Sequence, residues 1–339
     1  MQRNFNECYD HELLISVVIV AKDAQKTIGQ ALTSVFNNTR KPDETIVVVD
    51  DLQDPTLKAL DSYPVKVIIN KFKGIGGARK VGVEASKGDI IIFIDADSTA
   101  HPNLIEEFEK AFHENPDVKV QAASLADDPY INEQDTLEYA PAMRLAFRKH
   151  VIDLVGNFDE NLKMGWEDID FCLRCGKEKI KIYCNKRAIM FHHANNARVV
   201  LKKAARDGGC LAQTSLKHGL RVISCTGTSI LFLHCGLIHV AIISAIVIGL
   251  NLYTLSPLLL SLTLRFCRFI LKLLRERKTS RIRSTHTYSP IKTTKYTAIH
   301  LLSKTIKSFI VNYMKYFFFT YGFFIACLTI LMKKFRMQK

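Results

Sequence analysis

Residues 90–97, with the sequence IIIFIDAD, constrain the fold of this chain more than any other stretch. The apolar run is too short to be a helix on length alone, so it predicts a strand buried on both faces. Residues two apart on a strand point to the same side, so Asp95 and Asp97 could bind one hard cation through their carboxylate oxygens. A solvated acidic turn is the alternative for an Asp-x-Asp sequence taken by itself.

Predicted strands and helices alternate along the chain up to residue 97. Apolar, β-branched runs predict further strands at residues 14–20, 46–49 and 65–69. Apolar residues at helical spacing predict one helix over residues 27–36, and a glycine-rich start predicts another over residues 75–86. This alternation predicts an α/β fold with a mostly parallel sheet covered by helices on both faces.

Polar turns follow three of the predicted strands. They contain Lys22 and Asp23, Asp50 and Asp51, and Asp95 and Asp97. The carboxyl ends of parallel strands share one edge of a sheet, so we expect these turns to form a single cleft. One acidic turn is ordinary, but three at one edge predict a site for a cation and a polar ligand.

Residues 74–79, with the sequence GIGGAR, add a glycine-rich helix start. A helix N-terminus binds phosphate through its free backbone N–H groups, and the guanidinium of Arg79 suits a diphosphate. The glycines do not follow the first strand as Gly-x-Gly-x-x-Gly, and the chain has no Walker lysine motif. A dehydrogenase-type dinucleotide site and a P-loop are therefore not supported.

The charge is distributed unevenly along the 339 residues, whose net charge is +14. From Gly208 onward there are 19 Lys and Arg residues and one acid, Glu276. Uncharged runs at residues 229–250, 253–264 and 316–332 lie in the same region, so we expect its partner to be a membrane and not nucleic acid. The first residues lack a signal-peptide core and the cysteines form no disulfide framework, so the catalytic part is expected to be cytoplasmic.

Several motifs occur together in the order seen in family 2 glycosyltransferases of GT-A fold, a Rossmann-like α/β arrangement. They are SVVIV at 16–20, VVDD at 48–51, GIGGAR at 74–79, GDIIIFIDAD at 88–97, GNFDE at 156–160 and WEDID at 166–170. The chain resembles this family over about residues 14–195. The resemblance implies an inverting enzyme that uses a nucleotide-sugar donor.

The resemblance also assigns roles to individual residues. The donor-binding residues would be Ala21, Lys22, Asp23, Asp50, Asp51, Gly76, Arg79 and Asp95. Mg²⁺ or Mn²⁺ would be bound by Asp95 and Asp97, with His192 or His193 as a further ligand. Asp168 would be the catalytic base, with Trp166 and Glu167 on the acceptor side.

Glycosyl transfer itself requires groups of these kinds. A divalent cation neutralises the charge that develops on the departing diphosphate, and a carboxylate takes the proton of the acceptor hydroxyl. The acids at the start of the helix predicted from Glu167 could instead serve only to stabilise its N-terminus. Between the cation motif and this helix, the basic residues Arg144, Arg148, Lys149 and His150 could face an acceptor phosphate or form a solvated surface.

The sequence departs from the family pattern at Leu52 and Lys80, which leaves the donor specificity open. The Gln-x-x-Arg-Trp motif of processive synthases is absent, since the one tryptophan is Trp166. We therefore expect transfer of a single sugar, a hexose, to a lipid-linked or membrane-proximal acceptor in cell-envelope or glycoprotein glycan assembly. A polyprenyl-phosphate glycosyltransferase and a non-catalytic membrane scaffold with the same fold remain the alternatives.

The expected domain organisation places an enzyme before a membrane anchor. An extension over residues 1–13 precedes a GT-A catalytic domain over 14–207 and a linker over 208–228. Residues 229–274 would form a membrane hairpin, or one span and an interfacial helix. A basic cytoplasmic loop over 275–310, placed by the positive-inside rule, would precede a membrane helix over 311–333. The expected location is the cell membrane.

Overall fold

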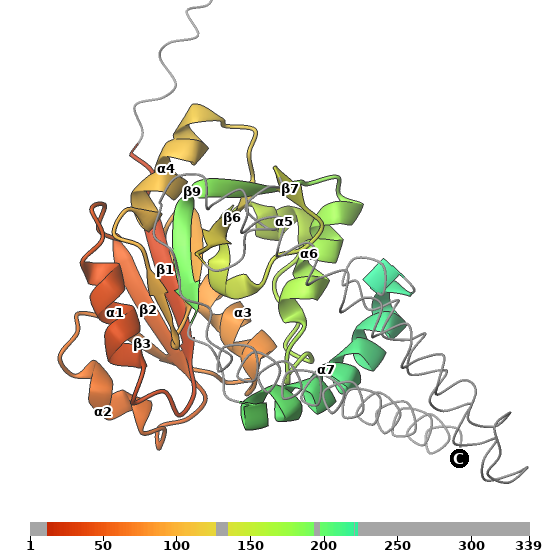
Figure 1. The fold of residues 1–339 in the computed structure, drawn as a ribbon, viewed down its shortest axis with the longest axis horizontal. Coiled ribbons are helices and arrows are strands. Elements are labelled where there is room, and N and C mark those ends of the chain that lie inside the picture. Colours follow the sequence, from red (N-terminus) through yellow and green to blue (C-terminus); the bar gives the residue numbers. More distant parts are fainter. Residues whose placement is uncertain (1–11, 127–134, 193–196, 220, 223–339) are drawn as a thin grey trace, which may run out of the picture. The chain divides into compact units, whose positions relative to one another are not determined.

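The computed structural model describes residues 12–126, 135–192, 197–219, 221 and 222 (Figure 1). The chain divides into two compact units, one of Met1–Asn196 with Gly209–Cys225 and one of Ala197–Gly208 with Thr226–Lys339. The predicted membrane segments at 229–274 and 311–333 and the basic loop between them lie outside the described residues. Within the described part, no helix has the length and apolar character needed to cross a bilayer.

The strands of the first unit are β1 (Ile15–Ala21), β2 (Glu44–Val49), β3 (Lys66–Ile69), β4 (Ile90–Asp95), β5 (Ser98–Ala100), β6 (Val120–Leu125), β7 (Thr136–Leu137), β8 (Leu145–Arg148) and β9 (Ile182–His192). The helices are α1 (Ile28–Phe36), α2 (Thr56–Leu60), α3 (Ile75–Ala85), α4 (Leu104–Glu114), the 3₁₀ helix η3 (Ala142–Arg144), α5 (Val151–Val155), α6 (Glu167–Lys177) and α7 (Ala197–His218), which continues into the first unit from the second.

The described strands form one sheet in the order β3-β2-β1-β4-β8-β6-β9-β5, with β7 also paired to β9. Strands β3, β2, β1 and β4 are parallel to one another, and β6 is parallel to β9. Strand β8 is antiparallel to both β4 and β6, and β5 and β7 are antiparallel to β9. The predicted α/β fold is confirmed, but the sheet is mixed: only its β3-β2-β1-β4 part is parallel throughout.

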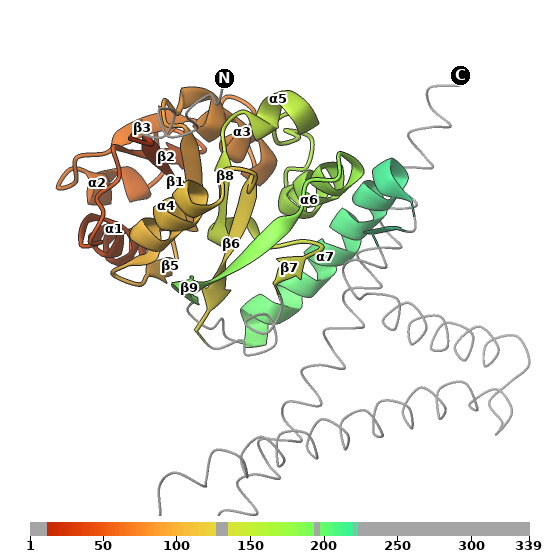
Figure 2. The ribbon, with the colours of Figure 1, turned by 90° about the horizontal axis from the view of Figure 1, so that it is seen from above.

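Helices cover both faces of the sheet, as predicted. On one face, α1 and α4 pack against β1, β2 and β4 through buried residues such as Leu32 and Phe108. On the other face, α3, α5 and α6 pack against alternate residues of these strands and of β8; the ring centroid of Phe171 in α6 lies 5.3 Å from that of Phe147 in β8. Figure 2 shows α1 and α4 together on one side of the sheet and α3 and α5 on the other. Burial on both faces explains why these strands are continuous apolar runs.

Candidate active site

The parallel register brings the predicted polar turns to one edge of the sheet. Ala21, the last residue of β1, pairs with Val49 of β2, and Val20 pairs with Asp95 of β4. The turns after β1, β2 and β4 therefore begin side by side. This edge is where an open parallel sheet binds ligands.

Asp50 is held in place from three directions. Its Oδ1 accepts hydrogen bonds from Nδ2 of Asn70 at 2.8 Å and from the backbone N–H of Gly74 at 3.1 Å, and Lys22 Nζ lies 3.3 Å from Oδ2. Asn70 directly follows β3 and is buried. Asn70 is not among the residues predicted from the sequence, although a polar residue after a predicted strand was the available signal.

The turn after β1 depends on Asp54, which is also not among the residues predicted from the sequence. Asp23 has a positive φ of 51°, and its N–H donates to both carboxylate oxygens of Asp54, at 3.3 and 3.2 Å. Asp54 is buried and also accepts from the N–H of Thr56 at 2.8 Å. Burial would raise the pKa of Asp54, but the hydrogen bonds from Thr56 and Asp23 outweigh it and hold the pKa below its usual range. An ionised Asp54 thus fixes the turn beside Asp51, which remains exposed.

Arg79 links the two halves of the site. Its Nη2 is 2.9 Å from Oδ1 of Asp95, and its Nε is 2.8 Å from Oε1 of Glu167. The Arg79 side chain is only 2% exposed and stacks 4.9 Å from the ring centroid of Phe93. The guanidinium therefore joins the end of β4 to the first residue of α6. Its Nη1 is buried and has no hydrogen-bond partner within the described residues, so it remains available as a donor.

The N-terminus of α3 differs from the expected phosphate cradle. The N–H of Ile75 donates to the carbonyl of Lys163 at 3.1 Å, and that of Gly76 donates to the carbonyl of Leu162 at 3.2 Å. A Cβ on Gly76 would lie 2.2 Å from the carbonyl oxygen of Asp159. These two N–H groups are thus used by the loop before α6 and are not free for a phosphate. The glycine is required because the backbone of that loop approaches closely.

Asp168 lies in the first turn of α6, where the chain enters the helix through an unusual backbone conformation. Trp166, immediately before the helix, has a φ of 66°, in the left-handed region that costs a non-glycine residue energy. Oδ2 of Asp168 accepts from the N–H of Ala142 at 3.1 Å, and Oδ1 accepts from the N–H of Ile169 at 2.8 Å. Burial raises the pKa of Asp168, although Arg79 and these two N–H groups oppose the shift. A carboxylate with a raised pKa is a better proton acceptor near neutral pH.

Glu167, the other predicted acceptor-side residue, is 2% exposed and points to Arg79. Burial and the adjacent Asp168 raise the pKa of Glu167, and Arg79 opposes this shift. The observed contact makes Glu167 a link between α6 and Arg79.

The predicted cation ligands lie at the same edge. Asp95 uses Oδ1 for Arg79, and Asp97 is partly exposed and makes no ion pair within the described part. The pairing of β5 with β9 places His192 opposite Ser98, with its Nδ1 3.3 Å from Ser98 Oγ. His193 lies outside the described residues. Where residues are described, no cluster of three potential ligands occurs. The carboxylate oxygens suit Mg²⁺ or Mn²⁺, which commonly bind one or two carboxylates and take their other ligands from phosphate and water.

Three of the four basic residues before α5, namely Arg144, Arg148 and Lys149, bind backbone carbonyls, and His150 is exposed. Arg144 is buried and donates Nη1 to the carbonyl of Ala123 at 2.9 Å. Arg148 donates to the carbonyls of Val118, at 3.1 Å, and Phe112, at 2.8 Å. Arg144 is buried, so it forms neither an acceptor-phosphate site nor a solvated face, whereas Arg148 remains partly exposed. Their role is to hold β8 against β6 and the end of α4.

Residues 16–167 match the sequence model of a protein family described as glycosyl transferase family 2. This part of the chain is similar to glycosyl transferase family 2. The match covers the strand-end turns and ends at Glu167, so it includes every described candidate residue except Asp168 and His192. The prediction of a glycosyltransferase is confirmed for this part of the chain.

Proteins similar to this chain include two whose names refer to lipid-linked sugars. One is the "Glucosyl-dolichyl phosphate glucuronosyltransferase" of Haloferax volcanii, 22% identical over 57% of this chain and 67% of the relative. The other is the "UDP-Glc:alpha-D-GlcNAc-diphosphoundecaprenol beta-1,3-glucosyltransferase WfgD" of Escherichia coli, 31% identical over 28% of this chain and 39% of the relative. The chain thus spans well under half of the second relative.

Among solved structures, the crystal structure of S. aureus TarS 1-349 in complex with UDP-GlcNAc is similar to this chain. The TM-score is 0.47 and the identity 17%, over 62% of this chain and 72% of that one. A likeness at this level does not identify the fold by itself.

Proposed function

We propose that this chain is a metal-dependent glycosyltransferase of GT-A fold that transfers one sugar, with inversion, from a nucleotide-sugar to a lipid-linked acceptor. The observation that carries the proposal is the convergence at one sheet edge. The turns with Asp50, Asp95 and Asp97 adjoin, and Arg79 connects Asp95 to the helix that begins at Glu167 and bears Asp168. The family match over residues 16–167 supports the donor class.

In this proposal the strand-end turns bind the donor. The turn with Asp50 and Asp51, fixed by Asn70 and Asp54, would bind the nucleoside. Asp97 and the free oxygen of Asp95 would bind Mg²⁺ or Mn²⁺ together with the diphosphate, and the cation would stabilise the negative charge on the leaving diphosphate. Arg79 holds Asp95 in position, and its buried Nη1 has no hydrogen-bond partner within the described residues.

Asp168 would then carry out the proton transfer. The acceptor oxygen forms a bond to the anomeric carbon as the bond from that carbon to the diphosphate oxygen breaks. The hydroxyl proton passes to the carboxylate of Asp168. General-base catalysis of this kind contributes roughly 10²–10⁴-fold in rate. The two backbone hydrogen bonds to Asp168 fix the direction from which it receives the proton.

The acceptor and the location are inferred from the relatives and the sequence. The names of both relatives refer to polyprenol-phosphate-linked compounds, which supports a lipid-linked acceptor. The basic, apolar region beyond residue 222 supports a chain bound at the cell membrane with its catalytic part in the cytoplasm.

A thermal-shift screen of UDP-, GDP- and TDP-sugars, with and without Mn²⁺, tests the donor assignment. Ligand binding to the folded state raises the melting temperature. We expect one nucleotide series to stabilise the protein, and to do so more strongly with Mn²⁺. Absence of a shift with every nucleotide-sugar at millimolar concentration would contradict the proposed function.

A further inference from the structure

Asp170, two residues after the proposed base, is fully buried and surrounded by basic side chains. Its Oδ2 lies 2.9 Å from Nε and 2.9 Å from Nη2 of Arg174, on the same helix. Its Oδ1 lies 2.7 Å from Nζ of Lys217 and 2.8 Å from Nε2 of His218, at the end of α7. Two helices distant in the sequence are therefore joined through one carboxylate.

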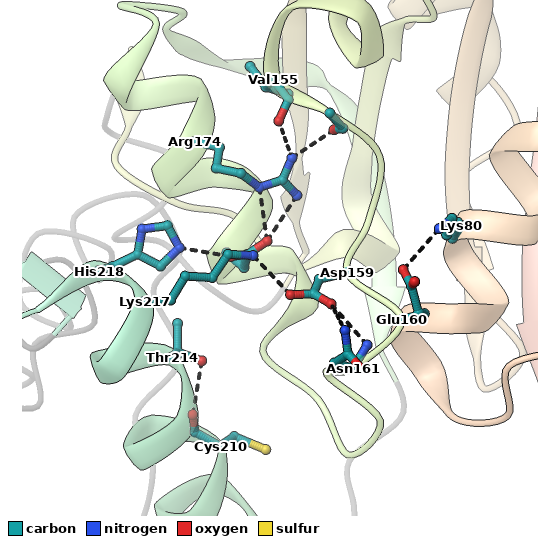
Figure 3. A network of polar contacts seen from close by, with 12 residues as sticks. Lys80, Val155, Asp159, Glu160, Asn161, Arg174, Cys210, Thr214, Lys217 and His218 are labelled. Carbon is teal, nitrogen blue, oxygen red and sulfur yellow. Dashed lines mark hydrogen bonds and ion pairs between the residues drawn. The ribbon is translucent and has the colours of Figure 1, made fainter.

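The same basic residues also bind the loop that precedes α6. Lys217 Nζ is 2.9 Å from Oδ2 of Asp159, and Arg174 Nη1 donates to the carbonyl of Gly156 at 2.7 Å. Figure 3 shows the contact between Lys217 and the carboxylate of Asp159. The end of α7 therefore contacts both the loop and the first turn of α6.

This loop and this turn are the parts that position the candidate site. Leu162 and Lys163 in the loop accept the first N–H groups of α3, and Asp168 and Glu167 lie in the turn. Residues two apart on a helix do not face the same side, so Asp170 can be held by α7 while Asp168 receives the N–H of Ala142.

An acid in the first turn of a helix does not need to be buried as Asp170 is. An exposed acid in the first turn would interact equally well with the helix dipole. A buried carboxylate is costly unless it is paired and hydrogen-bonded, and here three basic side chains supply the pairing. Although burial would raise the pKa of Asp170, the contacts with Lys217, Arg174 and His218 hold it below its usual range, so the group stays ionised at neutral pH.

We propose that Lys217 and His218 are positioning residues that hold the Asp168-bearing turn of α6 in its productive geometry through Asp170 and Asp159. The proposal rests on the proposed function. Within the described residues, no hydrogen bond or ion pair joins Lys217 or His218 to the donor-binding turns after β1, β2 and β4. Loss of either side chain should therefore affect the chemical step and not donor binding.

The test compares Lys217→Met and His218→Phe with Lys217→Arg in the full chain. A displacement of about 1 Å in a catalytic group can cost on the order of 10²-fold in rate. We expect kcat to fall by about 10- to 100-fold in the first two variants with an unchanged KM for the nucleotide-sugar. Lys217→Arg should restore most of the rate, because Arg can bridge two carboxylates.

Two controls separate positioning from loss of stability. Lys177→Met removes an exposed lysine of α6 and should leave kcat unchanged. Val35→Ala removes buried methyl groups of α1, far from the cluster in sequence, and should lower the melting temperature without lowering kcat at 25 °C.

Hydrogen–deuterium exchange supplies a readout that does not depend on turnover. We expect faster exchange over residues 157–170 in Lys217→Met and His218→Phe, and not in Val35→Ala. Unchanged exchange, or an equal fall of kcat in Val35→Ala, would overturn the positioning role. If the wild-type protein were inactive but Lys217→Met and His218→Phe still exchanged faster over residues 157–170, the proposed function would be refuted. The structural link between α7 and α6 would then still be established.

Discussion

Replacement of Arg79 by Met tests whether this buried guanidinium holds the site together. The variant leaves Glu167, 2% exposed, without its 2.8 Å partner and removes the 2.9 Å contact to Asp95. Removal of one partner from a buried ion pair typically costs about 3–5 kcal/mol, because the other charge remains desolvated. For a domain of this size, each kcal/mol lowers the melting temperature by roughly 2–4 °C, so we expect a fall of roughly 6–20 °C.

The neighbouring residue provides a matched control. Lys80 lies next to Arg79 and pairs with Glu160 at 2.9 Å, but both side chains are partly exposed, at 23% and 33%. An exposed pair contributes about 0–1 kcal/mol. Lys80→Met also removes one positive charge, so its melting temperature should fall by no more than about 4 °C.

A double variant checks the physical cause. Arg79→Met combined with Glu167→Gln removes the buried carboxylate as well as its partner, so it should be more stable than Arg79→Met alone. Differential scanning fluorimetry at pH 7.5 would measure all three proteins. Equal melting temperatures for Arg79→Met and Lys80→Met, or no recovery in the double variant, would refute the reasoning.

Three further changes have defined outcomes. Asp168→Asn should lower kcat by roughly 10²–10⁴-fold in a steady-state assay with little change in the donor KM, and full activity would exclude its role as base. Gly76→Ala places a Cβ 2.2 Å from the Asp159 carbonyl oxygen and should cost about 1–3 kcal/mol in urea unfolding, whereas a neutral effect would contradict the close approach. The pKa of Asp170 is lowered in the folded protein, so its ion pairs stabilise the fold at pH values above the unfolded-state pKa of about 3.9. This stabilisation is lost as the pH falls further. The stability difference between wild type and Asp170→Asn, from urea unfolding at several pH values, should therefore shrink below about pH 4, and a constant difference would contradict the pairing.

The parallel part of the sheet was predictable because each of its strands is recognisable from its own short stretch of sequence. The runs that form β1, β2 and β4 are apolar and β-branched, and each ends in a polar turn. Their shared edge follows from parallel pairing alone, so the grouping of Asp50, Asp95 and Asp97 could be inferred before the structure was known. The mixed part was not predictable, because β8 is only four residues long and carries Arg148.

The contacts within the site depend on residues far apart in the sequence. Arg79 suits a diphosphate in isolation, but its partner Glu167 comes 88 residues later. Separation in the sequence also explains why the glycines at the start of α3 were wrongly expected to bind phosphate. The loop that occupies the start of α3 begins beyond residue 155, and no local pattern at Gly76 indicates that this loop approaches it. His218 and Asp170 are likewise 48 residues apart.

The most direct test of the central claim is release of nucleoside diphosphate by the purified full chain. The assay would contain a nucleotide-sugar, a polyprenyl-diphosphate-linked sugar as acceptor, and Mn²⁺. We expect release that requires the acceptor, stops on addition of EDTA, and is lost in Asp97→Asn. No release from UDP-, GDP- or TDP-sugars, or release that persists with EDTA and in Asp97→Asn, would contradict a metal-dependent glycosyltransferase centred on Asp95 and Asp97.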